Sequence, residues 1–269
     1  MKSVFKRKSN SAKFSVDYNQ LMLDVLEKEG TIASCFHTFH NYSIRNQFLA
    51  YHQMKMRNIP LSPINSFKGW NSLNRSINKG EKAIYLWQPV NIKEKVKDKV
   101  TGELKEEEKI IFTFKPNWFA LSQTNGEDVK AENIKIGNFN FDNVYKKFDI
   151  KIVPFDTLNG NVQGFARVGN KELAINPVAK DLEMTILHEI AHIVLKHDEV
   201  DYGHALKELE AETVAYIVGS VLNLPESQLA NSRGYVQGYF KENEIPEKQA
   251  KNIMSAADKI LKAGYGLKK

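Results

Sequence analysis

The sequence contains a single cysteine, and this scarcity excludes an internal disulfide. Cys35 stands between Ile32 and Phe36, where we expect a small buried hydrophobic side chain. Long apolar runs are also lacking, since none approaches the roughly 20 residues that a helix needs to cross a bilayer. The basic residues 1–8 are followed by no apolar stretch, so a secretory signal is not expected. Together these absences predict a soluble, cytoplasmic protein.

Neither sign of charge dominates the chain, but its two halves differ. Of 38 Lys and Arg and 32 Asp and Glu, residues 1–130 contain 21 and 13, a balance of +8. Residues 131–269 contain the remaining 17 and 19, a balance of −2. The hydrophobic content of 42% is enough for a sizeable core. The asymmetry predicts two modules, the first facing a polyanion, although an excess of lysine that only keeps a protein soluble fits equally well.

Hydrophobic periodicity predicts the helices and strands of an α+β protein. The charge asymmetry and a linker candidate at 122–132 divide it into two expected domains, residues 1–125 and 133–269. Helices are expected at about 17–28, 42–57, 67–75, 141–148, 182–197, 205–222, from 225 onward, and at 247–263. Strands are expected at 83–90, 110–115, 150–154, 164–168 and 172–176. The charged stretch 93–109 predicts a hairpin arm with Thr101 and Gly102 at its tip. Residues 1–14 are expected to be a disordered arm, and residues 122–132 a linker.

The clearest motif is H-E-x-x-H over residues 188–192, set in an apolar helical pattern. Positions i and i+4 of an α-helix share a face, so His188 and His192 can reach one metal ion. Glu189 projects about one residue off that face, where it can act on a water molecule. The alternative is a chance meeting of His and Glu in a lysine-rich helix. The acidic helix that follows argues against chance, because it can supply a further ligand.

Zinc held by two histidines needs a third protein ligand and an open position. Asp198 lies six residues after His192, but the peptidases that use this spacing have a glycine midway, where this chain has Leu195. Glu208 and Glu212 share a face of the next predicted helix. They are therefore better candidates than Asp198.

The pattern Glu-x-x-Ala-acid over residues 208–212 resembles the ligand helix of gluzincin-type peptidases. This resemblance implies that Glu208 binds zinc and that Glu212 orients a ligating histidine, although the two roles could be exchanged. The same ligands can hold other divalent metals. Glu189 is then the expected general base, and Tyr202 and His204 are the nearest candidates for an oxyanion donor. A peptide could pair with the edge of the strand at 164–168.

The first half carries a second set of motifs. They are Tyr42-Ser43-Ile44-Arg45-Asn46-Gln47, Trp70, Arg75, Lys79-Gly80-Glu81-Lys82, Pro89 and Phe119-Ala120-Leu121-Ser122-Gln123-Thr124. These motifs resemble the N-terminal domain of the ArdC/LtrC-like antirestriction proteins, and the stretch 235–240 resembles the segment after the acidic helix of that family. The resemblance covers roughly residues 17–240. It implies a helical and β-hairpin domain that binds single-stranded DNA, followed by a zincin-like metallopeptidase domain. Proteins of this family are typically carried by plasmids and other mobile elements, and are thought to shield incoming DNA from restriction.

Proteins that bind single-stranded DNA combine a cationic groove with aromatic platforms on which bases stack. The residues expected to contact DNA are Tyr42, Arg45, Asn46, Gln47, Trp70, Arg75, Lys79, Lys82, Tyr85 and Trp87. Trp70 fits a core position as well as a stacking one. Tyr85 and Trp87 share a strand face, and the sequence leaves open whether that face is buried.

Three functions fit these observations. The first is an antirestriction-type protein that binds single-stranded DNA and carries a zinc metallopeptidase site. The second is a DNA-protecting protein whose zinc site is structural and hydrolyses nothing. The third is a cytoplasmic zinc peptidase that cleaves a regulatory protein or a restriction component and uses its basic half only to reach DNA.

Overall fold

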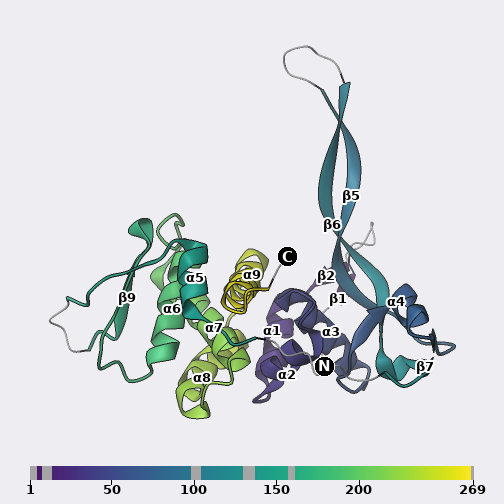
Figure 1. The fold of residues 1–269 in the computed structure, drawn as a ribbon, viewed down its shortest axis with the longest axis horizontal. Coiled ribbons are helices and arrows are strands. Elements are labelled where there is room, and N and C mark those ends of the chain that lie inside the picture. The colour runs from purple at the N-terminus through teal and green to yellow at the C-terminus, as the bar shows by residue number, and fades with distance from the viewer. Residues whose placement is uncertain (1–4, 8–13, 98–103, 130–136, 157–160, 268–269) are drawn as a thin grey trace. The chain divides into compact units, whose positions relative to one another are not determined.

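The computed structural model describes residues 5–7, 14–97, 104–129, 137–156 and 161–267 (Figure 1). The chain forms two compact units. The first, which we call the helical unit, comprises Met1–Phe48 and Ala131–Lys269, and the second, the hairpin unit, comprises Leu49–Lys130. The boundary falls inside helix α3 (Ile44–Met56). These packing units divide the chain at a different place from the domains expected at 1–125 and 133–269.

The helical unit is built around one central helix. Its helices are α1 (Tyr18–Leu26), α2 (Thr31–Phe39), α5 (Phe141–Phe148), α6 (Leu182–Leu195), α7 (His204–Val221), α8 (Glu226–Glu242) and α9 (Glu247–Gly264). α6 and α7 lie side by side, and α7 also packs against α2, α8 and α9 (Figure 1). Because helices surround α7, nearly every side chain from Leu209 to Val221 is buried. Within the described ranges, no helix is both long and apolar enough to span a membrane.

The first two helices belong to this unit because they pack on its C-terminal helices. Asn19 of α1 donates a hydrogen bond of 2.8 Å to the backbone carbonyl of Phe240 in α8. Phe36 of α2 stacks on Tyr265 with ring centroids 5.8 Å apart. The sequence patterns do not predict α2, which begins directly after Gly30 in a left-handed conformation, φ 73°. Cys35 of α2 is fully buried, as expected, and burial raises the pKa of its thiol to about 12.

A small sheet covers one side of α6 in the helical unit. Its strand order is β8 (Lys151–Ile152), β10 (Glu172–Ile175) and β9 (Gly164–Arg167), so that β9 is an edge strand. β9 and β10 pair antiparallel, as the sequence predicts, and β9 contacts α6. Two further strands, β1 (Phe5–Arg7) and β2 (Phe14–Val16), also pair antiparallel. The expected disordered arm is therefore wrong for residues 5–7 and 14, and its other residues lie outside the described ranges.

The hairpin unit contains the second part of α3 and a long two-stranded arm. Its other elements are β3 (Ile64–Ser66), α4 (Phe67–Ser72), β4 (Arg75–Ile77), β5 (Ile84–Lys97), β6 (Leu104–Ala120) and β7 (Thr124–Gly126). β5 and β6 pair antiparallel along the arm (Figure 1). The hairpin arm expected at 93–109 is confirmed in its described part, because charged residues beyond Ile92 continue the pairing of β5 with β6, as in the Lys93–Glu106 ion pair of 3.9 Å.

Two expectations about the ends of this arm have different outcomes. The expected tip at Thr101 and Gly102 lies outside the described residues. The expected linker at 122–132 is wrong in its first part, since β7 pairs with β4 there. Gly126 at φ 146° fits this pairing, because an added Cβ would lie 2.3 Å from the carbonyl oxygen of Asn74.

Candidate metal centre

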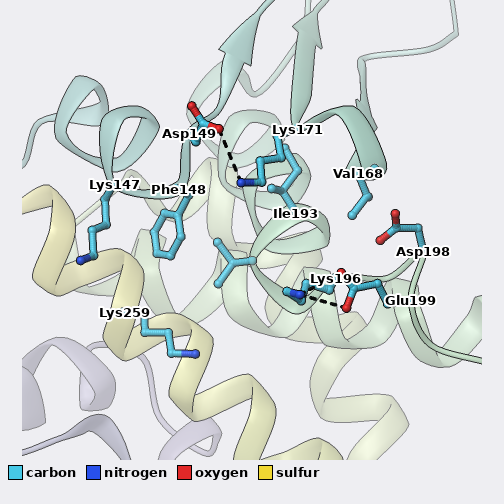
Figure 2. A pocket seen from close by; sticks show the side chains of 12 residues that line it. Lys147, Phe148, Asp149, Val168, Lys171, Ile193, Lys196, Asp198, Glu199 and Lys259 are labelled. Carbon is cyan, nitrogen blue, oxygen red and sulfur yellow. Dashed lines mark hydrogen bonds and ion pairs between the residues drawn. The ribbon is translucent and has the colours of Figure 1, made fainter.

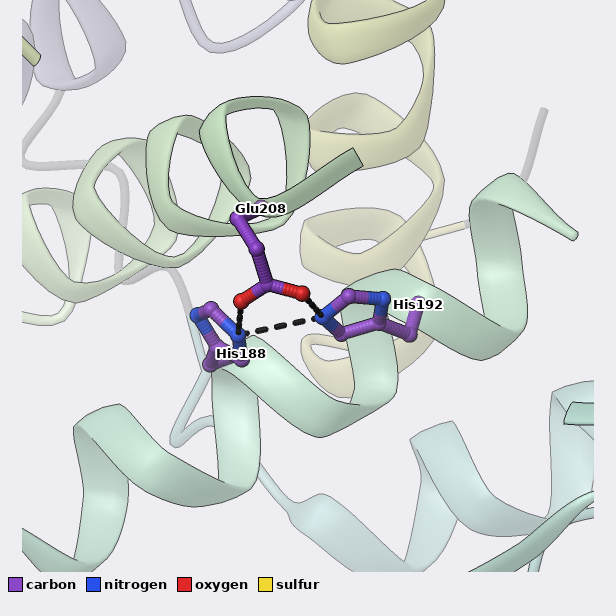
Figure 3. Close-up of side chains that lie close together, drawn as sticks. All are labelled: His188, His192 and Glu208. Atoms are coloured by element: carbon purple, nitrogen blue, oxygen red, sulfur yellow. Dashed lines mark hydrogen bonds and ion pairs between the residues drawn. The ribbon is translucent and has the colours of Figure 1, made fainter. Parts of the chain in front are cut away.

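Helix α6 presents two histidines toward α7. Its buried side chains include Leu187, Ile190 and Ala191, which fix the rotation of the helix on the core. His188 and His192, one turn apart, then face Glu208 in the first turns of α7 (Figure 3). The helical spacing predicted from the sequence thus brings two imidazoles and one carboxylate together.

The three side chains converge on one point. The Nε2 atoms of His188 and His192 are 3.1 Å apart, and the two carboxylate oxygens of Glu208 lie 3.2 Å and 3.4 Å from them (Figure 3). One ligand atom from each residue lies within 4.8 Å of the others. A tetrahedral zinc ion with metal–nitrogen distances of about 2.0–2.1 Å spaces its ligands about 3.3 Å apart. The donor set and its spacing therefore fit a divalent metal such as zinc.

Glu212 lies on the other side of His188. Its Oε2 is 2.8 Å from Nδ1 of His188, which leaves Nε2 of that ring directed at Glu208. Ser232 also donates a hydrogen bond to Glu212, and the pKa of Glu212 is lowered because these hydrogen bonds outweigh the effect of burial. This geometry favours Glu208 as the ligand and Glu212 as the residue that orients His188, the order implied by the resemblance to gluzincins.

The two histidines differ in their affinity for protons. Burial opposes protonation of His188, but its hydrogen bonds to Glu208 and Glu212 outweigh burial and raise its pKa to about 10. Burial, together with the charge of His188, lowers the pKa of His192 to about 4. At neutral pH His188 therefore carries an additional proton and a positive charge while His192 is neutral, and metal binding must displace that additional proton.

Glu189 connects the metal centre to the edge strand. Its carboxylate accepts a hydrogen bond from the backbone of Ala166 in β9. Burial and the nearby negative charge of Glu208 nevertheless raise its pKa above the ordinary value. A cleft of about 370 Å³ opens beside this carboxylate, lined by residues that include Gly164, Met184, Glu189 and Asn231. The site therefore combines a basic carboxylate, an open cleft and a strand edge.

The expected oxyanion donors lie in different surroundings. The hydroxyl of Tyr202 donates to Glu210, away from Glu208, so the structure contradicts its expected role. His204 is exposed, with Nδ1 3.3 Å from Oε1 of Glu208, and remains a candidate. Tyr235 of α8, which the sequence analysis does not identify, is a further candidate. Burial and the negative charges of Glu208 and Glu212 raise the pKa of its hydroxyl.

A second hollow, of about 420 Å³, lies in the same unit but is separate from the metal centre. It is lined by lysines and acids, among them Lys171, Lys196, Asp149 and Asp198, and by none of the three clustered ligand residues (Figure 2). Several of these charges are paired with one another, as in the Lys171–Asp149 contact of 3.6 Å. Asp198 therefore lines this hollow, consistent with its rejection as a third ligand.

Three of the expected DNA-contacting residues have structural roles instead. Trp70 is 2% exposed and donates from Nε1 to the carbonyl of Phe119 at 2.8 Å, so of the two positions that the sequence leaves open it has the core position and does not stack on bases. Gln47 is 1% exposed and donates to the carbonyl of Tyr42. Arg75 donates to the side chain and carbonyl of Thr124 at 2.8 Å and 3.0 Å, and to the carbonyl of Glu127. Side chains that are buried, or whose hydrogen-bond donors are used within the protein, are not available to contact DNA.

The remaining expected DNA contacts reach the surface. Lys79 and Lys82 are exposed, and Tyr42, Arg45 and Asn46 are partly exposed. The face of β5 that the sequence left open is now assigned: Ile84 and Leu86 are fully buried, whereas Tyr85 and Trp87 are partly exposed. These two rings each lie 5.4 Å from that of Phe114 and form an aromatic cluster with it.

Two known protein families match separate parts of the chain. Residues 23–118 match the family described as the N-terminal domain of anti-restriction factor ArdC. Residues 145–248 match a peptidase family described as the IrrE N-terminal-like domain. No curated protein matches the chain.

Crystal structures of the antirestriction ArdC protein from the R388 plasmid are similar to this chain. The metal-free structure is 15% identical over 94% of this chain and 99% of that one, with a TM-score of 0.49. The Mn(II)-bound structure is 13% identical over 93% of this chain and 99% of that one, with a TM-score of 0.50. At this level of identity the second comparison shows a shared fold.

The fold and the clustered ligands define an α+β protein with a zincin-like, metallopeptidase-like domain. A segment that matches the N-terminal domain of anti-restriction factor ArdC precedes it, and this order of two domains is ArdC-like. The resemblance to the ArdC/LtrC-like proteins and the α+β fold class predicted from the sequence are thereby confirmed.

Proposed function

We propose that this chain is an antirestriction-type protein of a mobile element that binds single-stranded DNA and carries a zinc-dependent metallopeptidase-like site. Residues 1–125 are the proposed DNA-binding domain and residues 133–269 the metallopeptidase-like domain. The observation that carries the proposal is the convergence of His188, His192 and Glu208 on one point, with Glu189 beside an open cleft. A cytoplasmic location remains a prediction from the sequence.

The proposed hydrolysis assigns one task to each residue of the centre. His188, His192 and Glu208 hold the metal, and Glu212 keeps Nε2 of His188 directed at it. When bound, zinc supplies a Lewis acid that polarises a carbonyl and lowers the pKa of water to about 7. Glu189 takes the proton from the attacking water and delivers it to the leaving amine.

The edge strand is the proposed holder of the substrate. Among the described strands, β9 pairs only with β10, so a peptide can add to its other edge as a further strand. Because Glu189 accepts a hydrogen bond from Ala166 of the same strand, a peptide bound there lies beside the general base. His204 and Tyr235 are the proposed oxyanion donors. Zinc is the proposed metal, although the same ligands can hold other divalent ions.

Part of the proposed DNA surface lies on the hairpin unit. Phe112 and Ile110 of β6 are 60% and 63% exposed. With Phe114 they occupy every second position of the strand, so the three share the face that bears Trp87. Exposed apolar side chains in a row are typical of a binding surface. Aromatic rings tolerate any base, and each stacked base contributes roughly 1–3 kcal/mol. Lys79 and Lys82 supply exposed charge for phosphates.

The second candidate is a DNA-protecting protein with a structural metal site. One observation weighs against it: Glu189 is neither a ligand nor buried in the core, but lines a cleft with its pKa raised. A structural site needs no such carboxylate. The third candidate, a peptidase that cleaves a regulator, shares the proposed chemistry and differs only in its substrate.

The DNA-binding part is tested by fluorescence anisotropy of a labelled single-stranded oligonucleotide and of the duplex of the same sequence, over a salt series. We expect preference for the single strand and a salt dependence with a slope of roughly −0.7 per phosphate contacted. Equal, weak binding of both forms would refute the proposal and leave the basic half with a charge that only aids solubility.

The metal centre is tested with Glu189→Gln, which keeps the size of the side chain and removes its basicity. We expect the variant to bind zinc as the parent does and to lose hydrolysis of an unfolded protein such as casein by at least roughly 100-fold. Protection of transforming DNA from restriction is measured in parallel. Full protection by Glu189→Gln would show that the peptidase chemistry is not what protects DNA.

A further inference from the structure

A series of hydrogen-bonded polar side chains leads away from the metal centre on the side of His192. Its Nδ1, the ring nitrogen not facing Glu208, lies 2.8 Å from Nδ1 of His197. Nε2 of His197 lies 3.1 Å from Oε2 of Glu210 in α7. The hydroxyl of Tyr202 donates to the same oxygen. Neither His197 nor Glu210 is a defining residue of the motifs that predict the metal centre.

The side chains of this series are buried, unlike those of a surface ion pair. The side chains of His197 and Glu210 are 3% and 0% exposed. A carboxylate without water is costly to bury unless donors or a cation compensate it. Glu208 and Glu212 share the face of α7 that looks at His188, whereas Glu210, two positions from each, lies off that face. The structure therefore keeps a buried carboxylate that cannot be explained as a ligand.

The tautomers of the two imidazoles follow from a bound metal. A neutral imidazole carries one N–H, so Nε2 of His192 can bind metal only when its proton is on Nδ1. That N–H then donates to Nδ1 of His197, whose own proton must be on Nε2, where it donates to Glu210. The imidazole N–H groups of His192 and His197 thus each have an acceptor. The opposite direction would place the proton of His192 on Nε2, at the metal position.

We propose that His197 and Glu210 form a positioning relay, anchored by Tyr202, that fixes the ring and the tautomer of His192 and strengthens its binding to the metal. This inference rests on the proposed metal site. The two histidines of the centre are then supported differently. Glu212 contacts His188 directly at 2.8 Å, whereas Glu210 acts on His192 through an intervening imidazole.

The relay is tested first by zinc affinity, measured by competition with a chromogenic chelator on the full chain. Partners that orient ligating histidines typically change metal affinity by 10–100-fold. We expect Glu210→Gln and His197→Phe to weaken zinc binding by about this factor, and Tyr202→Phe by less, because His197 still holds Glu210. The matched control is Glu199→Gln, which removes an exposed carboxylate that pairs only with Lys196 among the described contacts. It should bind zinc as the parent does.

The outcomes separate the relay from the site itself. A parent protein that binds no zinc would refute the metal centre and the relay together. A parent that binds zinc, with folded Glu210→Gln and His197→Phe variants that bind it equally well, would overturn the relay alone. A lower melting temperature with unchanged zinc affinity would show a merely structural role and would also overturn it.

A measurement on the unaltered chain does not depend on the folding of any variant. Long-range ¹H–¹⁵N spectra of the zinc-loaded protein report which nitrogen of each imidazole carries a proton. We expect the proton of His197 on Nε2 and the proton of His192 on Nδ1. A proton on Nδ1 of His197 would contradict the proposed direction of the relay.

Discussion

The metal ligands predicted in the helical unit and two of the DNA contacts predicted in the hairpin unit have opposite outcomes. In the helical unit, His188, His192 and Glu208 converge with interatomic distances of 3.1–3.4 Å. In the hairpin unit, Trp70 is in the core and Arg75 holds β4 and β7 in place. A tryptophan or an arginine that could contact DNA can equally well pack in a core or hold two strands together. The comparison teaches that a motif with helical spacing specifies geometry, whereas residues scattered over several elements do not.

The metal centre itself repeats this contrast on a smaller scale. Glu208 and Glu212 follow a spacing that a helix converts directly into positions around His188. Glu210 belongs to the same run of acids, yet it serves a different histidine through His197. A sequence pattern assigns the first pair and leaves the third acid without a role.

The largest effect is expected from the two tryptophans of the hairpin unit. Truncating a fully buried tryptophan typically costs about 3–5 kcal/mol, so Trp70→Ala should greatly lower the free energy of unfolding. Trp87→Ala should cost less stability but weaken binding of single-stranded DNA by roughly 1–3 kcal/mol. Urea unfolding and anisotropy measure the two quantities. If folded Trp70→Ala protein loses DNA affinity while Trp87→Ala retains it, the assignment of core and surface is reversed.

A smaller effect separates two cations of the same unit. Arg75→Ala removes the donors that hold Thr124 and Glu127, at a cost of about 1–3 kcal/mol in stability. Lys79→Ala removes an exposed charge, so its stability should change by no more than about 0.5 kcal/mol. If Lys79 contacts one phosphate, the salt slope of DNA binding falls by roughly 0.7. A stable Arg75→Ala variant with a reduced salt slope would return Arg75 to the DNA surface.

The smallest effect concerns the core of the helical unit. The pKa of buried Cys35, about 12, lies above the ordinary value of 9.0, so its stabilising contribution is complete below pH 9 and is lost as the pH rises toward 12. By pH 10 this loss amounts to about 1.4 kcal/mol. Between pH 8 and pH 10, Cys35→Ala should therefore lose less stability than the parent by that amount. The free energy of unfolding is measured in urea at both pH values. Equal losses for the parent and for Cys35→Ala would contradict the burial of the thiol.

Much of the fold follows from local patterns. Helices α6 and α7, the β9–β10 hairpin and the pairing of β5 with β6 are expected from periodicity and turn residues, with boundaries that shift by a few residues. α2 is missed because Gly30 reads as the end of one helix and conceals the start of the next. The grouping of residues 1–48 with 131–269 is missed because it depends on packing between segments far apart in the chain.

The sequence alone determined the motif on α6, the acids on α7 and the ArdC-like order of the two parts, because helical spacing and sequential motifs are local properties. Only the tertiary structure decided that Glu208 faces both Nε2 atoms, that Glu212 supports His188 and that Glu210 reaches His192 through His197. It also decided which rings of the hairpin unit are buried. These outcomes depend on how elements are rotated and packed, which the spacing within any one element does not specify.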